Sequence, residues 1–204
     1  MIELITKVVT STEFWSGLGG AIVGGVFTLL GTHIEGNRQE RKSIEDAKEK
    51  RLNVLIGVKA EMDCLVALYK ERMEHAMNNY NGKEPFALQF PVTQNYFTFY
   101  EANSLVLSSV KEKTLNEIVS LYASSRSLVD SFRGNNAVLE QLVMSRKIYE
   151  ETRRPEHKFQ FEQEYMIAVD YGQGLQGIHE QTMDKYKTCM AAISKEINEL
   201  RNTK

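Results

Sequence analysis

The side chains best suited to catalysis or metal binding are scattered along this 204-residue chain. Its four histidines are His33, His75, His157 and His179. No Glu-x-x-His pattern occurs, so the ligand set of a di-iron helical bundle is missing. The chain also has no HExxH, Cys-x-x-Cys, P-loop or Gly-x-Ser-x-Gly sequence. We therefore predict that it is not an enzyme and that it uses no metal and no cofactor.

One nucleotide-binding pattern, Gly172-x-Gly174-x-x-Gly177, does occur. A dinucleotide site needs this sequence between a β-strand and a helix of a βαβ unit. Here it lies inside a helical pattern with no preceding strand. We interpret the three glycines as places of close helix packing or as a helix kink.

The two cysteines, Cys64 and Cys189, stand far apart on two predicted helices. Disulfides are rare in the cytoplasm, and a single buried cysteine behaves as a small apolar residue. We expect both to be core residues rather than a disulfide or metal pair.

The charge balance argues against one class of partner. The chain has 25 Lys and Arg residues against 27 Asp and Glu residues, a net charge of -2. A general nucleic-acid-binding protein needs an excess of cations to neutralise phosphates. We therefore expect no nucleic-acid partner.

The elements that must position any site are organised around an uncharged stretch, Phe14 to Ile34. At about 1.5 Å per residue, a helix of this length reaches roughly 31 Å, the thickness of the hydrocarbon core of a bilayer. A signal peptide would need a positive n-region and a cleavage site, and a buried core helix seldom stays uncharged for so long. We predict a transmembrane helix at residues 14–35.

The orientation follows from the cations, because Lys and Arg are retained on the cytoplasmic side. Lys7 and the free amine precede the span, whereas six cations lie in residues 38–51. We therefore predict that residues 1–13 form a short extracytoplasmic tail. The C-terminal domain is expected in the cytoplasm, with membrane lipid as one partner.

Small residues form two rows within the predicted span. One row is Gly20, Gly24, Thr28 and Thr32, and the other is Gly17, Ala21 and Gly25. Small residues let two membrane helices approach closely, so the rows predict a homo-oligomer. Ordinary composition is the alternative, since glycine is common in membrane helices.

A charged stalk and a first packed helix follow the span. Residues 36–51 are almost wholly polar, with six cations and four anions interleaved, which is typical of a solvated helix. Apolar residues then recur three and four positions apart, as a packed helix requires. This seam consists of Leu55, Val58, Met62, Leu65 and Tyr69. No turn signal precedes Asn81-Gly82, so span, stalk and seam are predicted as one helix.

Residues 83–103 form a predicted loop that is rich in aromatic rings and interrupted by Pro85 and Pro91. A linker would be polar, so we expect this loop to bury its rings. Two interpretations remain open: an aromatic plug over the far end of a bundle, or a pocket for a ligand or partner. The candidate partner surface is Phe90, Tyr96, Phe99 and Tyr100.

Two more helices complete the predicted domain, residues 52–204. Thr114 and Glu117 have capping-box spacing and predict a helix that runs through Gly134 to about Thr152. Its apolar positions are Leu115, Ile118, Tyr122, Val129, Phe132, Leu139 and Val143. The last helix, from about Glu156 to Asn202, ends in a heptad seam of Met183, Tyr186, Met190, Ile193, Ile197 and Leu200. Long helices with short connections pack antiparallel, so we predict an all-α protein with an antiparallel three- or four-helix bundle.

One segment of this domain resembles known sequences. Residues 91–136 contain Tyr96, Tyr100, Asn103, an Ile118-Val119-x-x-Tyr122 helix and the ending Ser131-Phe132-Arg133-x-Asn135-Asn136. This string resembles uncharacterised bacterial single-span membrane proteins that are often carried on prophages and other mobile elements. The resemblance implies a bacterial inner-membrane location and a role in phage or element biology. It implies no activity.

Three functions compete on these features. The favoured one is a membrane-anchored interaction or sensor protein with a cytoplasmic protein partner, acting in phage defence or superinfection exclusion. The alternative is an oligomeric membrane-perturbing effector, although a lone span without polar lining residues makes a poor pore. An enzyme is least favoured, since no nucleophile, base or metal set is recognisable. We expect the cations Arg146, Lys147, Arg153 and Arg154 to form a solvated surface.

Overall fold

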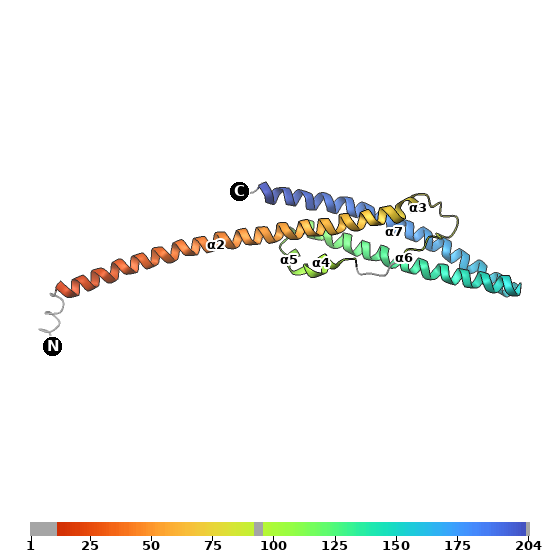
Figure 1. The fold of residues 1–204 in the computed structure, drawn as a ribbon, viewed down its shortest axis with the longest axis horizontal. Coiled ribbons are helices and arrows are strands. Elements are labelled where there is room, and N and C mark those ends of the chain that lie inside the picture. Colours follow the sequence, from red (N-terminus) through yellow and green to blue (C-terminus); the bar gives the residue numbers. More distant parts are fainter. Residues whose placement is uncertain (1–11, 92–95, 203–204) are drawn as a thin grey trace, which may run out of the picture. The chain divides into compact units, whose positions relative to one another are not determined.

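A computed structural model describes residues 12–91 and 96–202, with side chains described at residue 25 and from residue 28 onward. The chain forms two compact units, Met1–Glu49 and Lys50–Lys204. The described residues contain helices and no strand (Figure 1). The fold class is therefore all-α, as predicted.

The first unit is helical through the predicted span and stalk. Helix α2 (Thr12–Tyr69) begins within it, and the large apolar side chains of Leu29, Leu30 and Ile34 are exposed. Among the described residues that were searched, no helix is long and apolar enough to cross a membrane. Most side chains of the predicted span, and the predicted tail up to residue 11, lie outside the described residues.

Three long helices build the described part of the second unit: the C-terminal part of α2, α6 (Glu112–Thr152) and α7 (Pro155–Asn202) (Figure 1). α6 runs parallel to α2, because Glu61 meets Tyr122 and Tyr69 meets Phe132 further along both helices. α7 runs antiparallel to α2, since Arg51 meets Glu196. The prediction of an antiparallel bundle is therefore right for α7, which runs antiparallel to both other long helices, and wrong for α2 and α6, which run parallel to each other.

The connection between α2 and α6 explains the parallel pair. After the π-helical segment η1 (Lys70–Glu74) and α3 (His75–Asn78), the chain returns along the side of the bundle. It ends in two short helices, α4 (Thr98–Ala102) and α5 (Ser104–Leu107), which the sequence did not predict. The loop therefore does not close the far end of the bundle as a plug. It lies lengthwise and brings the start of α6 back beside Arg51.

The start of α6 differs from the predicted capping box. The helix begins at Glu112 with Lys111 as its N-cap, no side chain caps it locally, and Thr114 is buried. The backbone N–H of Lys111 donates instead to Glu196 Oε1 at 3.1 Å. A carboxylate from α7 thus replaces local capping at this helix end.

The predicted apolar seams form most of the core. Leu55, Val58 and Met62 of α2 are buried, as are Met190, Ile193 and Ile197 of α7. Gly134 lies inside α6, as expected. Val143 is an exception, because 66% of it is exposed. α3 ends at Asn78, and the described hydrogen bonds of the loop reach α6 no further than Asn136, so among the described elements this end of α6 packs on α7 alone and the face of Val143 stays exposed.

The predictions for the cysteines and the glycines are each right at some positions and wrong at others. Cys189 is buried and burial raises the pKa of its thiol to about 12, but Cys64 is exposed, so the core prediction for Cys64 is wrong. Gly172 is buried against Tyr80 and Phe86, which confirms close packing at that position. A Cβ on Gly174 or Gly177 would meet no atom within 4 Å, so these two glycines do not serve close packing.

Candidate functional site

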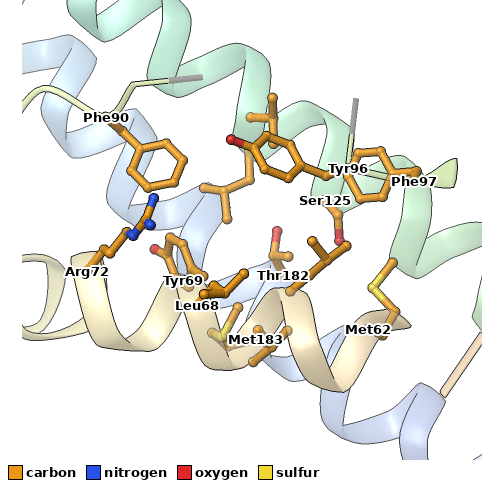
Figure 2. Close-up of a pocket in the computed structure, with 14 residues that line it drawn as sticks. Met62, Leu68, Tyr69, Arg72, Phe90, Tyr96, Phe97, Ser125, Thr182 and Met183 are labelled. Atoms are coloured by element: carbon orange, nitrogen blue, oxygen red, sulfur yellow. The ribbon is translucent and has the colours of Figure 1, made fainter. Parts of the chain in front are cut away.

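An aromatic pocket of about 100 Å³ lies between α2, α6, α7 and the returning connection (Figure 2). Its lining is mainly apolar, and it is partly open to solvent. The lining residues are Met62, Leu65, Val66, Leu68, Tyr69, Arg72, Phe90, Tyr96, Phe97, Ser125, Leu128, Val129, Thr182 and Met183. Small-molecule sites in proteins share this character, an apolar cavity with few polar groups.

The inner wall of the aromatic pocket is fixed by a hydrogen bond between two rings. The Tyr69 hydroxyl lies 2.7 Å from Nδ1 of His179, which is buried on α7. Burial lowers the pKa of His179, which favours the neutral imidazole. Burial also raises the pKa of Tyr69, with a further contribution from Glu74. Both groups are therefore neutral near pH 7, and this wall carries no charge.

A π turn places the one cation of the lining. Beyond Tyr69 the buried residues of α2, η1 and α3 are Met73 and Met77, each four residues after the last. Two successive steps of four exceed the 3.6 residues of an α-helical turn, and the wider π turn accommodates them. Arg72 lies within this turn, and Figure 2 shows its guanidinium at the edge of the pocket near Phe90 and Tyr69.

Two asparagines on α6 hold one side of the connection. Asn136 accepts from the backbone N–H of Phe90 at 3.2 Å and donates to the Phe90 carbonyl at 2.8 Å. Its neighbour Asn135, which is buried, donates to the carbonyl of Phe86 at 3.0 Å. The side-chain amides therefore pair with loop backbone as a neighbouring strand would. They fix the position of the Phe90 ring in the pocket wall.

A carboxylate on α2 holds the other side. Glu61 accepts from the backbone N–H groups of Phe99 and Tyr100, at 2.6 and 3.2 Å, and from the Tyr122 hydroxyl at 2.6 Å. The two amides are at the start of α4, where unpaired N–H groups favour an anion. Burial and the hydrogen bond to Glu61 raise the pKa of Tyr122. The Tyr100 ring stacks on Tyr122 with centroids 3.9 Å apart.

The four predicted partner residues thus divide into two pairs. Phe90 and Tyr96 line the pocket, as the pocket interpretation of the loop expected. Phe99 packs on Gly57, where a Cβ would lie 1.9 Å from its ring, and Tyr100 stacks on Tyr122. The loop is therefore pocket wall in one part and core in another. The pocket interpretation describes the first part, and the plug interpretation is wrong because the loop lies along the side of the bundle.

Of the predicted membrane-packing residues, the structure describes the side-chain positions of Gly25 and Thr28, and neither lines the pocket. Gly25 and Thr28 are exposed, and a Cβ on Gly25 would meet no atom within 4 Å. Gly17, Gly20, Ala21 and Gly24 lie outside the described side chains. The cations Arg146, Lys147, Arg153 and Arg154 are exposed, as expected.

Sequence reasoning missed Glu61, Arg72 and His179 as parts of the site. The change from alternating gaps to two gaps of four after Tyr69 was the one signal that could have drawn attention to Arg72. No group of three His, Cys, Asp or Glu side chains in the described ranges could hold a metal ion. Comparison with protein-family models, with curated proteins and with solved structures gives no match to this chain.

Proposed function

We propose that this chain is a membrane-anchored helical interaction or sensor protein, whose cytoplasmic bundle recognises its partner through the aromatic pocket. The observation that carries the proposal is the pocket itself, an apolar cavity of about 100 Å³ whose walls are fixed by Glu61, Asn136 and the Tyr69–His179 pair. Pre-organised walls lower the ordering cost of binding. Such a cavity suits recognition better than a reaction.

The anchor is supported by sequence and by exposure. The stretch from Phe14 to Ile34 carries no charge, and its described end exposes Leu29, Leu30 and Ile34. Large apolar side chains exposed together on a helix suit a lipid environment. The cations that follow favour an N-terminus outside and a C-terminal domain in the cytoplasm of a bacterium. The sequence resemblance favours a role in phage defence or superinfection exclusion.

The alternative function is an oligomeric membrane-perturbing effector. The rows of small residues at Gly17–Gly25 and Gly20–Thr28 favour self-association in lipid under either function. Ion leakage separates the two. Liposomes that contain the full-length protein stay sealed if it is an interaction protein, and they lose a trapped ion if it perturbs membranes.

Recognition through the pocket is tested by capture from bacterial membranes. Leu68 lines the pocket and is 42% exposed, so Leu68→Trp fills the mouth without disturbing the core. Leu105, outside the pocket on α5, is 88% exposed and offers a matched control, Leu105→Trp. We expect one specific cytoplasmic partner with the wild type and with Leu105→Trp, and none with Leu68→Trp. The same proteins captured by all three would contradict the proposal.

A further inference from the structure

The described lining of the aromatic pocket contains one charged group, the guanidinium of Arg72. Two hydroxyls of the lining are already engaged: the Tyr69 hydroxyl with His179 at 2.7 Å, and the Thr182 hydroxyl with the Ile178 carbonyl at 2.8 Å. Within the described part of the chain, no carboxylate lies at salt-bridge distance from Arg72. Lys70 of the same turn, by contrast, pairs with Glu74 at 3.4 Å.

The volume of the pocket limits what can enter it. A dry cavity of about 150 Å³ lined by Leu, Ile and Phe binds benzene. The pocket here, of about 100 Å³ and partly open, has room for one ring or a short branched chain. A helix or a long acyl chain is too large. The pocket therefore has the size of a small-molecule site, and a partner protein that contacts it inserts no more than one side chain.

The lining favours a ring over an alkyl chain. Tyr69, Phe90, Tyr96 and Phe97 all contribute to the wall (Figure 2). Aromatic pairs gain beyond their buried area when they meet edge to face or offset. An aromatic ring therefore gains more in this pocket than a saturated chain of the same volume.

We propose that the aromatic pocket binds a small aromatic carboxylate, with its ring among the aromatic side chains and its carboxylate paired with Arg72. This inference rests on the proposed recognition role of the pocket. Guanidinium and carboxylate form two parallel N–H···O bonds, a geometry that selects carboxylates. Because Arg72 is at the exposed edge, solvent and salt screen the pair, so its contribution to affinity is largest at low ionic strength.

The test uses full-length protein in lipid nanodiscs at low ionic strength, with phenylacetate as probe and phenylacetamide as its neutral analogue. Met62 and Met183 line the pocket, so their ¹³C-labelled methyl signals report binding directly. We expect both signals to shift with phenylacetate, which should bind about tenfold more tightly than phenylacetamide.

Three variants test whether the preference for phenylacetate over phenylacetamide comes from Arg72 and from the pocket. Arg72→Gln should bind the two probes equally, because the charged partner is gone. Lys70→Gln removes a cation from the same turn without touching the pocket lining, and it should keep the tenfold preference. Leu68→Trp should bind neither probe, since the ring occupies the mouth.

Other results would overturn the inference. Equal binding of the two probes by the wild type, a tenfold preference that survives Arg72→Gln, or binding to Leu68→Trp each contradicts it. Absence of probe binding while Leu68→Trp still abolishes partner capture would overturn this ligand class and leave the proposed function in place. Probe binding without pocket-dependent capture would overturn the proposed function alone.

Discussion

At the scale of single residues, polar side chains rather than the rings themselves fix the shape of the pocket. Glu61 satisfies two amides of α4 and one tyrosine hydroxyl, and Asn136 satisfies both backbone groups of Phe90. Hydrogen bonds to a charged group contribute about 1.5–3 kcal/mol each. The aromatic rings alone could pack in several arrangements, whereas the hydrogen bonds of Glu61 and Asn136 select one arrangement.

Gly172 and Gly174 offer a matched pair of substitutions on one helix. A Cβ on Gly172 would lie 2.3 Å from the Tyr80 hydroxyl, which donates to the Glu84 carbonyl, and 3.2 Å from Phe86 Cβ. Gly172→Ala should therefore destabilise the bundle by about 1–2 kcal/mol through overpacking. Gly174→Ala meets nothing and should stabilise α7 by about 0.5–1 kcal/mol. Urea unfolding of residues 50–204 measures both, and equal effects would contradict the packing shown at Gly172.

The buried His179 predicts how stability depends on pH. Its pKa is lowered in the folded state by burial, while Glu180 and Glu74 act in the opposite direction. The unfolded chain therefore binds the proton more readily below about pH 6.5, and stability is lost as the pH falls through that value. The limit is one proton, or about 1.4 kcal/mol per pH unit.

His179→Gln removes this titration and keeps a side chain that can hydrogen-bond to the Tyr69 hydroxyl. The free energy of unfolding, measured by urea at pH 7.5 and 5.5, should fall less in this variant than in the wild type. His75 is exposed on α3, and His75→Gln should behave as the wild type. If the free energy of unfolding changes by the same amount between pH 7.5 and 5.5 in all three proteins, His179 is not the group responsible.

At the scale of elements, helices were predictable where periodicity is local and unpredictable where one element depends on another. The seams at Leu55–Met62 and Met190–Ile197 follow from spacing in the sequence, and burial confirms them. The parallel course of α6 does not, because it depends on the path of the connection. α4 was missed for the same reason: it has five residues, and a carboxylate on α2 supplies its N-terminal partner.

The candidate site shows the same limit. The aromatic content of residues 83–103 indicated a loop with buried rings, and Phe90 and Tyr96 were predicted on that basis. The sequence could not separate Phe90 and Tyr96 from Phe99 and Tyr100. Over so few residues, the spacing of the rings does not show whether the chain is extended or helical, and it does not show which residues each ring will face. The surfaces opposite each ring decide the outcome, and they come from three other helices.

Glu196 joins three elements at the other end of the bundle. Its carboxylate is 2% exposed and accepts from Arg51 Nε of α2 at 2.6 Å and from the Lys111 N–H at 3.1 Å. Arg51→Gln leaves this buried carboxylate without its cation, a change that costs about 3–5 kcal/mol in comparable pairs. A fragment that begins at Leu52 lacks Arg51 and should lose as much stability as Arg51→Gln. Residues 50–204 keep Arg51 and should fold.

The exposed pair of Lys111 and Glu199 provides the control for that experiment. Both side chains are largely solvated, so Lys111→Gln should change the free energy of unfolding little. Urea unfolding of residues 50–204 compares the two variants. Equal stability of Arg51→Gln and Lys111→Gln would mean that the Arg51–Glu196 pair does not support the fold.

At the scale of the whole molecule, the bundle should be stable in water, whereas the exposed apolar side chains of the first unit suit lipid. The bundle closes its seams on one another, so residues 50–204 should be strongly helical without detergent. The first unit exposes Leu29, Leu30 and Ile34 on a helix whose neighbouring stretch carries no charge. Carbonate extraction of bacterial membranes should therefore retain the full chain and release residues 50–204.

The small residues of the proposed span lead to the last prediction. If Gly20 and Gly24 allow two helices to approach, Gly24→Ile inserts a branched side chain where the backbones would meet. The lost packing should cost about 1–2 kcal/mol, or roughly five- to thirty-fold in association. Val26→Ile should do far less, because that position already carries a branched side chain. A membrane two-hybrid reporter built on residues 10–38 excludes contributions from the bundle. Equal signals from the two variants would mean that the glycines reflect composition and that this segment serves as an anchor without self-association.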